Sequence, residues 1–211
     1  MTEFDVHVVD DDDDMREALS NLLKVLGYKV VSHRSAGEFL FSASPVNVGC
    51  VLLDVDMPGQ TGLDLQRVLI EKRQQVPIVF LSGKSDISMC AQAFKAGAVD
   101  FLTKPFGREA LQAAIDAAVA RSEQHRTLDR EAAALRRRYE SLSDKERAVT
   151  EHVMLGRLNK QIASEFGVSE RTIKHYRAHV MEKMQVKSLP QLVQAMVSMH
   201  GDANRAPEAV G

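Results

Sequence analysis

The chain has 211 residues, of which 45% are hydrophobic and 27% charged, and its formal net charge is −2. These fractions are typical of a globular protein and exclude a disordered or collagen-like chain. The N-terminus has no basic segment followed by an apolar core, and no apolar run reaches membrane-spanning length, so we expect a cytoplasmic protein without membrane contact. We expect Cys50 and Cys90 to be reduced core residues.

The charge is distributed unevenly along the chain. Residues 1–107 carry 15 acidic and 10 basic side chains, whereas residues 141–200 carry 6 acidic and 9 basic side chains and four histidines. A basic second region can meet a polyanion such as a nucleic acid, although so small an excess also fits ordinary scatter. The asymmetry indicates two domains.

The first half alternates short apolar runs with amphipathic segments. We predict strands at Val6–Val9, Lys29–Ser32, Val51–Asp54, Pro77–Leu81 and Val99–Leu102. We predict helices at Met15–Leu26, after Ser35, at Gly62–Ile70, at Ile87–Ala96 and from Arg108 onward. This alternation predicts an α/β domain with right-handed crossovers, and the common solution at this size is a flavodoxin-like parallel sheet of order 2-1-3-4-5.

A long helical linker is predicted next, because no Pro or Gly lies between Arg108 and Glu140. Its apolar residues have a 4-3-4-3 spacing, at Leu128, Ala132, Leu135, Tyr139 and Leu142. This spacing fits either a short coiled-coil seam or an amphipathic linker that packs on its own domains.

The last part of the chain reads as an all-α helix-turn-helix domain. Helices are predicted from the cap Ser143 to near Gly156, from Asn159 to Phe166, from the cap Ser169 to Met184 and from the cap Ser188 to about His200. The predicted boundaries are 1–121 for the α/β domain, 122–140 for the linker, 141–200 for the helix-turn-helix domain and 201–211 for a disordered tail.

Polar residues stand at the carboxyl ends of four predicted strands, which a sheet of this order brings to one edge. They are Asp10 and Asp11, Asp54, Ser82 and Lys104. Neighbouring carboxylates repel one another in an empty site, and a hard cation such as Mg²⁺ relieves this repulsion. A cation, a carboxylate nucleophile, a hydroxyl and an ammonium together suit phosphoryl transfer to Asp54.

Four segments resemble the signature of two-component response regulator receiver domains over residues 4 to about 121. They are Val9-Asp10-Asp11, Asp54 with Met57-Pro58-Gly59, Ser82-Gly83 and Lys104-Pro105-Phe106. The resemblance implies that Asp54 is the phosphoacceptor, with Lys104 and Ser82 assisting. It also implies a switch of Ser82 and Phe101, a cis bond before Pro105, and an Mg²⁺ (or Mn²⁺) site. The implied metal ligands are Asp11, Asp54, the backbone carbonyl of Asp56 and, through water, Asp10.

Asp56 departs from the basic or neutral residue expected at that position in such domains. We expect its charge to alter metal affinity and the lifetime of the acyl phosphate. The spacing Asp54-x-Asp56 also leaves open a haloacid-dehalogenase-type phosphatase. In that class, however, the pair follows an early strand and is followed by a hydroxyl residue, whereas here Met57-Pro58-Gly59 follows.

The predicted helix Arg171–Met184 has the pattern of a recognition helix. Ile173, Val180 and Met184 form its inward stripe. Lys174, His175 and Ala178 then face outward, where a recognition helix meets base edges. Residues able to reach phosphates are Lys160, Ser169, Arg171, Thr172 and Arg177.

Residues 140–200 resemble the LuxR-type helix-turn-helix, on Gly156-x-x-Asn159-Lys160 and Val168-Ser169-x-Arg171-Thr172-Ile173-Lys174. With the receiver motifs, this resemblance places the chain in the FixJ/NarL class of response regulators. It implies a non-catalytic transcription regulator that a sensor histidine kinase phosphorylates, that then forms a homodimer and that binds double-stranded DNA. The alternative is a receiver that passes its signal by protein contact and uses its second domain weakly or not at all.

Overall fold

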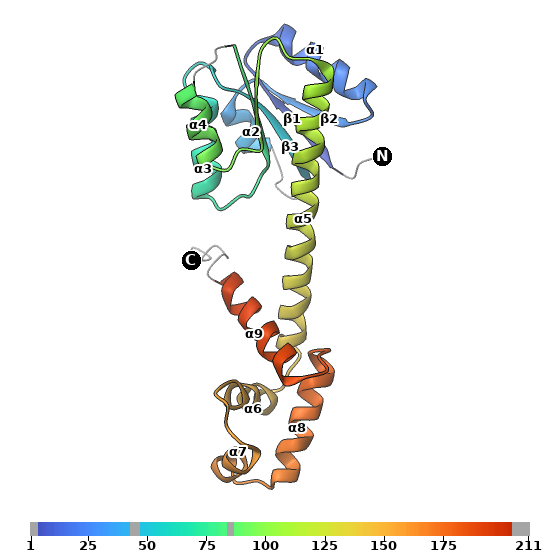
Figure 1. The fold of residues 1–211 in the computed structure, drawn as a ribbon, viewed down its shortest axis with the longest axis vertical. Helices are drawn as coiled ribbons and strands as arrows, with labels where there is room; N and C mark the ends of the chain where they lie inside the picture. The colour runs from blue at the N-terminus through green and yellow to red at the C-terminus, as the bar shows by residue number, and fades with distance from the viewer. Residues whose placement is uncertain (1–3, 43–46, 84–86, 204–211) are drawn as a thin grey trace. The chain divides into compact units, whose positions relative to one another are not determined.

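The computed structural model describes residues 4–42, 47–83 and 87–203, and residues 1–126 and 127–211 form two compact units. The strands of the first unit are β1 (Asp5–Val9), β2 (Lys29–His33), β3 (Val48–Asp54), β4 (Ile78–Ser82) and β5 (Asp100–Thr103) (Figure 1). Its helices are α1 (Asp13–Val25), α2 (Ala36–Ser42), α3 (Gly62–Glu71), α4 (Ile87–Lys95) and the first part of α5 (Arg108–Glu140).

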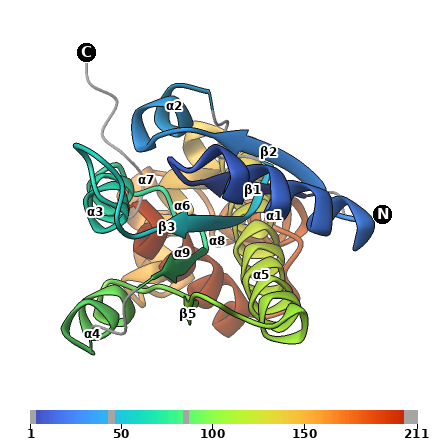
Figure 2. The same ribbon diagram turned by 90° about the horizontal axis from the view of Figure 1, so that it is seen from above.

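The five strands form one parallel sheet of order β2-β1-β3-β4-β5, which confirms the flavodoxin-like prediction. All seven residues of β3, in the middle, are buried. Cys50 and Leu52 pack in the layer with α1 and α5, whereas Val51 and Leu53 pack in the layer with α2, α3 and α4. Figure 2 shows these helices on the two faces of the sheet. A strand covered on both faces must be apolar on both, which explains the unbroken apolar run.

β3 begins at Val48, three residues earlier than the apolar run predicted. Gly49 lies inside the strand and not in a turn. A Cβ atom at Gly49 would lie 2.6 Å from Cβ of Phe4, so the close approach of Phe4 requires glycine here.

The second unit is all helical, as predicted. It holds the rest of α5 with α6 (Asp144–Met154), α7 (Asn159–Phe166), α8 (Glu170–Lys183) and α9 (Leu189–Ala203). Its core includes Leu142, Val149, Ile162, Ile173 and Val180. The first three residues of the predicted tail belong to α9, and residues 204–211 lie outside the described residues.

α5 is one continuous helix over the predicted range, and the boundary between the units falls within it. Leu111 and Ile115 pack on the sheet, whereas Leu135 and Tyr139 pack on the core of the second unit. Leu128 is 60% exposed. Three of the five residues of the predicted seam, Leu135, Tyr139 and Leu142, are therefore used inside a single unit, which favours the linker that packs on its own domain.

Candidate functional site

The carboxyl ends of the parallel strands gather two carboxylates around one ammonium group. Asp10 follows β1, Asp54 ends β3 and Lys104 follows β5. Lys104 Nζ donates to Asp10 Oδ2 at 2.9 Å and to Asp54 Oδ1 at 2.6 Å. Both acceptors are buried, with 1% of Asp10 and 6% of Asp54 exposed. Three residues separated by up to 94 positions thus form one polar cluster.

Ser82 and Phe101 lie on the strands beside this cluster. Ser82, the last residue of β4, is fully buried, and its carbonyl accepts a hydrogen bond of 2.7 Å from the backbone N of Lys104. The Lys104–Pro105 peptide bond is cis. The half-buried Phe101 of β5 has its ring centroid 6.1 Å from that of Phe80. Both predicted switch positions therefore adjoin the strand ends that carry Asp54 and Lys104.

The loop after β3 is held tightly against Asp54. The backbone N of Asp56 donates to Asp54 Oδ2 at 2.9 Å, and the N of Gly62 donates to the carbonyl of Val55 at 3.1 Å. A Cβ atom at Gly62 would lie 2.3 Å from the backbone oxygen of Asp54. Glycine at this position lets the first turn of α3 approach Asp54.

The charges of the cluster do not balance. Burial raises the pKa of Asp54 above its usual 3.8, the ammonium of Lys104 opposes that rise, and the carboxylate of Asp10 adds to it. Burial lowers the pKa of Lys104, but its hydrogen bonds to the two carboxylates outweigh burial and the net shift is upward. One ammonium for two buried carboxylates leaves an excess of negative charge, which attracts a further cation.

The carboxylate oxygens of Asp10 and Asp54 fit a hard divalent cation, since Mg²⁺ takes one or two carboxylates and keeps several waters. Asp11 and Asp56 are exposed residues that follow β1 and β3. Within residues 4–42, 47–83 and 87–203, no group of three or more His, Cys, Asp or Glu side chains is placed to hold a metal ion. The structure therefore brings Asp10 and Asp54 together but does not bring Asp11 into the same group.

Arg16 is a residue of this site that the sequence reasoning missed. Its side chain is buried, its Nη1 donates to the backbone oxygen of Asp10 at 2.7 Å, and its Nη2 pairs with Asp13. Asp10 is thus fixed at its carbonyl by Arg16 and at its carboxylate by Lys104. A signal was present, because Arg16 falls on the same helical face as the buried Leu19.

In the second unit, the predicted DNA contacts largely lie on exposed surfaces of α7 and α8. The exposed residues are Lys160, Ser169, Arg171, Lys174, His175 and Ala178. Ser169 caps α8, because its Oγ accepts a hydrogen bond from the backbone N of Thr172 at 3.1 Å. Thr172 is half-buried, and its Oγ1 lies 2.9 Å from Ser169 Oγ. Ile173, Val180 and Met184 are buried as predicted.

Arg177 lies apart from this exposed set. Its Nη1 donates to Asn159 Oδ1 at 2.7 Å, so it ties α8 to the start of α7. It also lines a small cavity of about 70 Å³ between α6, α8 and α9, beside Val153, Met181 and Leu192. The structure thus gives Arg177 a packing role that a count of basic residues did not reveal.

Comparison with known proteins matches both units. Residues 6–116 match the model of the response regulator receiver domain, and residues 140–196 match that of the bacterial regulatory proteins of the luxR family. The chain is 42% identical to nodulation protein W of Bradyrhizobium diazoefficiens, over 96% of this chain and 89% of that protein. It is 41% identical to the transcriptional regulatory protein FixJ of Azorhizobium caulinodans, over 89% of each chain. The chain belongs to the FixJ/NarL class of two-component response regulators.

The solved structure of the response regulator StyR resembles this regulator, with a TM-score of 0.80 and 38% identity over 93% of this chain and 99% of that one. The regulator is a DNA-binding transcription regulator whose partner is a histidine kinase, and it is not a conventional enzyme. Receiver domains in general use Mg²⁺ for phosphorylation. Membership in this class excludes the haloacid-dehalogenase-type phosphatase that the spacing Asp54-x-Asp56 had left open. No helix among the described residues is long and apolar enough to span a membrane.

Proposed function

We propose that Asp54 of this regulator is the phosphoacceptor and that the acyl phosphate formed there controls DNA binding by α8. The observation that carries the proposal is the pairing of Lys104 with both Asp54 and Asp10 in one buried cluster. A carboxylate with a raised pKa is more basic and therefore a better nucleophile, and the ammonium beside it suits a group that brings negative oxygens.

In the proposed transfer, Asp54 attacks the phosphorus of a phosphohistidine of the kinase. An O–P bond forms, the N–P bond breaks, and the departing imidazole takes up a proton from solvent, since the attacking carboxylate has none to give. A bound Mg²⁺ supplies charge neutralisation of the phosphoryl oxygens. We assign Asp11, Asp54 and the carbonyl of Asp56 to the metal, with Asp10 acting through water; the exposed side chain of Asp11 would turn toward Asp54 to take this role. Slow loss of the phosphoryl group to water completes this regulator's own phosphoryl chemistry.

The proposed readout is a movement of Ser82 and Phe101. Once phosphorylated, Asp54 carries oxygens that can accept from the Ser82 hydroxyl, and the movement of Ser82 frees space for the ring of Phe101. The exposed apolar residues of α4, Ile87 and Phe94, support a change of contacts on this face, which we propose as the homodimer surface of the phosphorylated state. The cytoplasm is the compartment in which such a dimer would reach chromosomal DNA.

We propose that Lys174, His175 and Ala178 meet base edges and that Lys160, Ser169, Arg171 and Thr172 meet phosphates. Arg177 acts on DNA through its contact with Asn159 near the start of α7. The domain boundaries that we propose remain 1–121, 122–140 and 141–200, although the compact second unit begins at Thr127 within α5.

DNA footprinting with and without acetyl phosphate, on the wild type and on Asp54→Ala, tests the proposal. We expect protection of specific fragments that acetyl phosphate strengthens in the wild type and leaves unchanged in Asp54→Ala. Equal protection in all conditions would contradict the switch. Absence of protection on every genomic fragment would support the receiver that signals by protein contact.

A further inference from the structure

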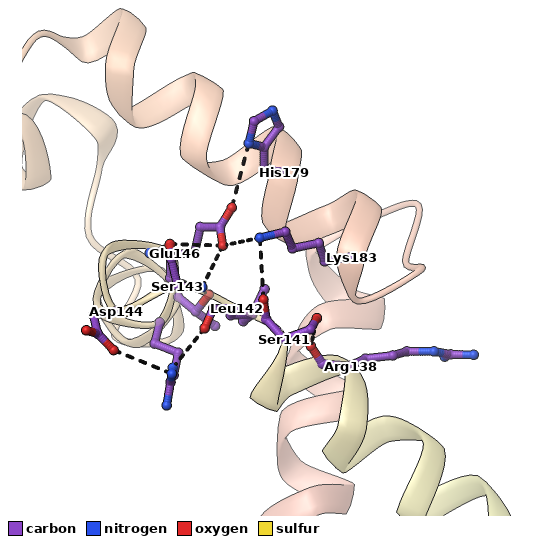
Figure 3. Close-up of polar contacts among 10 residues, drawn as sticks. Arg138, Ser141, Leu142, Ser143, Asp144, Glu146, His179 and Lys183 are labelled. Carbon is purple, nitrogen blue, oxygen red and sulfur yellow. Dashed lines mark hydrogen bonds and ion pairs between the residues drawn. The ribbon is translucent and has the colours of Figure 1, made fainter.

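Glu146 of α6 is a buried carboxylate, one of whose oxygens accepts three hydrogen bonds. Only 3% of it is exposed. Its Oε2 accepts hydrogen bonds from Lys183 Nζ at 2.6 Å, from the Ser143 backbone N at 2.8 Å and from Ser143 Oγ at 3.0 Å. Figure 3 shows these contacts between the start of α6 and the end of α8. Glu146 thus joins the two helices and caps α6.

This carboxylate stays ionised at neutral pH. Burial raises its pKa, but the hydrogen bonds from Lys183 and Ser143 outweigh burial and lower the pKa to about 2. A charged and fixed acceptor in a buried position is a rigid anchor for any donor that approaches its free oxygen.

The other oxygen of Glu146 faces a histidine of the recognition helix. Oε1 lies 3.6 Å from His179 Nδ1, and the side chain of His179 is 44% exposed. Figure 3 shows the imidazole of His179 directed at Glu146. His179 also contacts His175, one turn earlier, with ring centroids 4.1 Å apart and ring planes 55° from parallel. His175 is exposed beside Lys174 and Arg171.

We infer that His179 is a positioning residue that orients the His175 imidazole on the exposed face of α8, with Glu146 as the anchor. The inference rests on the proposed DNA contact of α8. In this proposal the Oε1 of Glu146, 3.6 Å from Nδ1, restrains the ring of His179 electrostatically, and the contact of this ring with His175 limits the rotamers of His175. A side chain ordered before binding loses less entropy when it meets DNA, so specific binding gains more than non-specific binding.

The helix-to-helix contact itself does not need His179. Lys183 and Ser143 already hold Glu146, and Ile173 and Val180 bury the inner face of α8. A purely structural role would therefore leave DNA specificity unchanged when His179 is replaced. A positioning role predicts loss of specificity without loss of folding.

The test uses the full-length protein with Mg²⁺ and acetyl phosphate, and a randomised double-stranded DNA pool from which the wild type selects its preferred sequence. The measured quantity is the ratio of affinity for that sequence to affinity for scrambled DNA. We expect His175→Ala and His179→Ala each to lower this ratio roughly tenfold, the usual size for one base contact. We expect the double variant to lower it no further than His175→Ala does, since His179 acts through His175.

His179→Asn separates the two explanations, because its side-chain amide retains a donor toward Glu146 but has no ring. We expect wild-type thermal stability and a loss of specificity equal to that of His179→Ala. Gln194→Ala, at an exposed position of α9, is the matched control and should bind as the wild type does. Wild-type specificity in His179→Asn, or additive losses of specificity in the double variant, would overturn the inference. If the wild type selects no sequence at all, the proposed function is contradicted, and so is this inference, which rests on it.

Discussion

Each unit of this regulator holds a buried carboxylate beside a lysine, and the two carboxylates respond in opposite ways. The pKa of Asp54 is raised, whereas that of Glu146 falls to about 2. Asp54 shares its lysine with Asp10 and is left with too little positive charge. Glu146 accepts from Lys183 and from two donors of Ser143, and Lys183 also donates to the Ser141 carbonyl at 3.4 Å. Burial raises the pKa of both carboxylates. The donors around Glu146 outweigh burial, whereas those beside Asp54 do not, and this balance separates a site prepared for chemistry from one that holds helices together.

The largest effect is expected from removing the carboxylate of Asp54, which takes away the chemistry that distinguishes the first unit from the second. We expect Asp54→Asn to abolish phosphorylation by acetyl phosphate, because the amide that replaces the carboxylate is not a nucleophile, while the fold is retained. Separation of phosphorylated from unphosphorylated protein on a phosphate-binding gel measures this, with Asp64→Asn on α3 as control. An intact phosphorylated band in Asp54→Asn would assign the phosphoryl group to another residue.

A second difference between the units lies in their response to acid. Burial in the first unit lowers the pKa of His7 from 6.5 to about 4, aided by the neighbouring His33 and opposed by Asp5. His7 binds a proton more readily in the unfolded chain, where its pKa is not lowered. A falling pH therefore favours the unfolded state. We therefore expect the first unit to lose about 2–3 kcal/mol of stability between pH 6.5 and pH 4.

Hydrogen exchange of the β1 amides, corrected for intrinsic rates, measures this loss. We expect His7→Gln to flatten the pH dependence while leaving the second unit unaffected. Protection of β1 that is constant from pH 7 to pH 4 in the wild type would contradict a neutral buried His7.

The second unit responds at lower pH. The pKa of Glu146 is lowered from 4.5 to about 2, so its stabilising effect is complete above 4.5 and is lost as the pH falls through 2. We expect a loss of about 1–2 kcal/mol, allowing for solvent screening of the half-exposed Lys183. Exchange of the α8 amides in the wild type and in Glu146→Gln measures it. The variant should show no such pH dependence below pH 4.5. An acid response equal to that of the wild type would contradict a stabilising role of ionised Glu146.

Arg16 is expected to support the phosphoacceptor site by holding the backbone of Asp10. It fixes the carbonyl of Asp10, so we expect Arg16→Met to lower the rate of phosphorylation and the affinity for Mg²⁺ roughly tenfold, the effect of one buried hydrogen bond to a charged group. Phosphorylation rate and calorimetric Mg²⁺ binding measure the two quantities. Arg67→Met is the matched control, because Arg67 also pairs with an aspartate three residues away but is exposed. Equal behaviour of the two variants would deny Arg16 a role at the site.

The smallest effect is expected at Asp56, whose exposed carboxylate adds negative charge beside the site. We expect Asp56→Arg to change the lifetime of the acyl phosphate by a few fold, about 1 kcal/mol in the barrier. Decay of isolated phosphorylated protein measures it, and equal lifetimes of variant and wild type would refute the effect.

Strand order and the meeting of Asp10, Asp54 and Lys104 could be predicted from the sequence, because a parallel sheet fixes where its carboxyl ends lie. The contact of Glu146 with His179 could not, since it joins residues 33 positions apart through the packing of α6 on α8. Arg177 lies four residues after the buried Ile173, so helical spacing places it toward the same side of α8. Its positive charge nevertheless suggested a contact with DNA phosphates, whereas its side chain donates to Asn159. Periodicity places a residue on a face, but only tertiary packing decides its partner.

Gly62 has a consequence for how the regulator tolerates sequence change. The residue is the buried first residue of α3, next to the exposed Thr61. A side chain there would collide with the backbone oxygen of Asp54. In a library of single substitutions, Gly62 should therefore behave as a position of the phosphoacceptor site, with even alanine depleted, while its neighbour Thr61 accepts serine or asparagine.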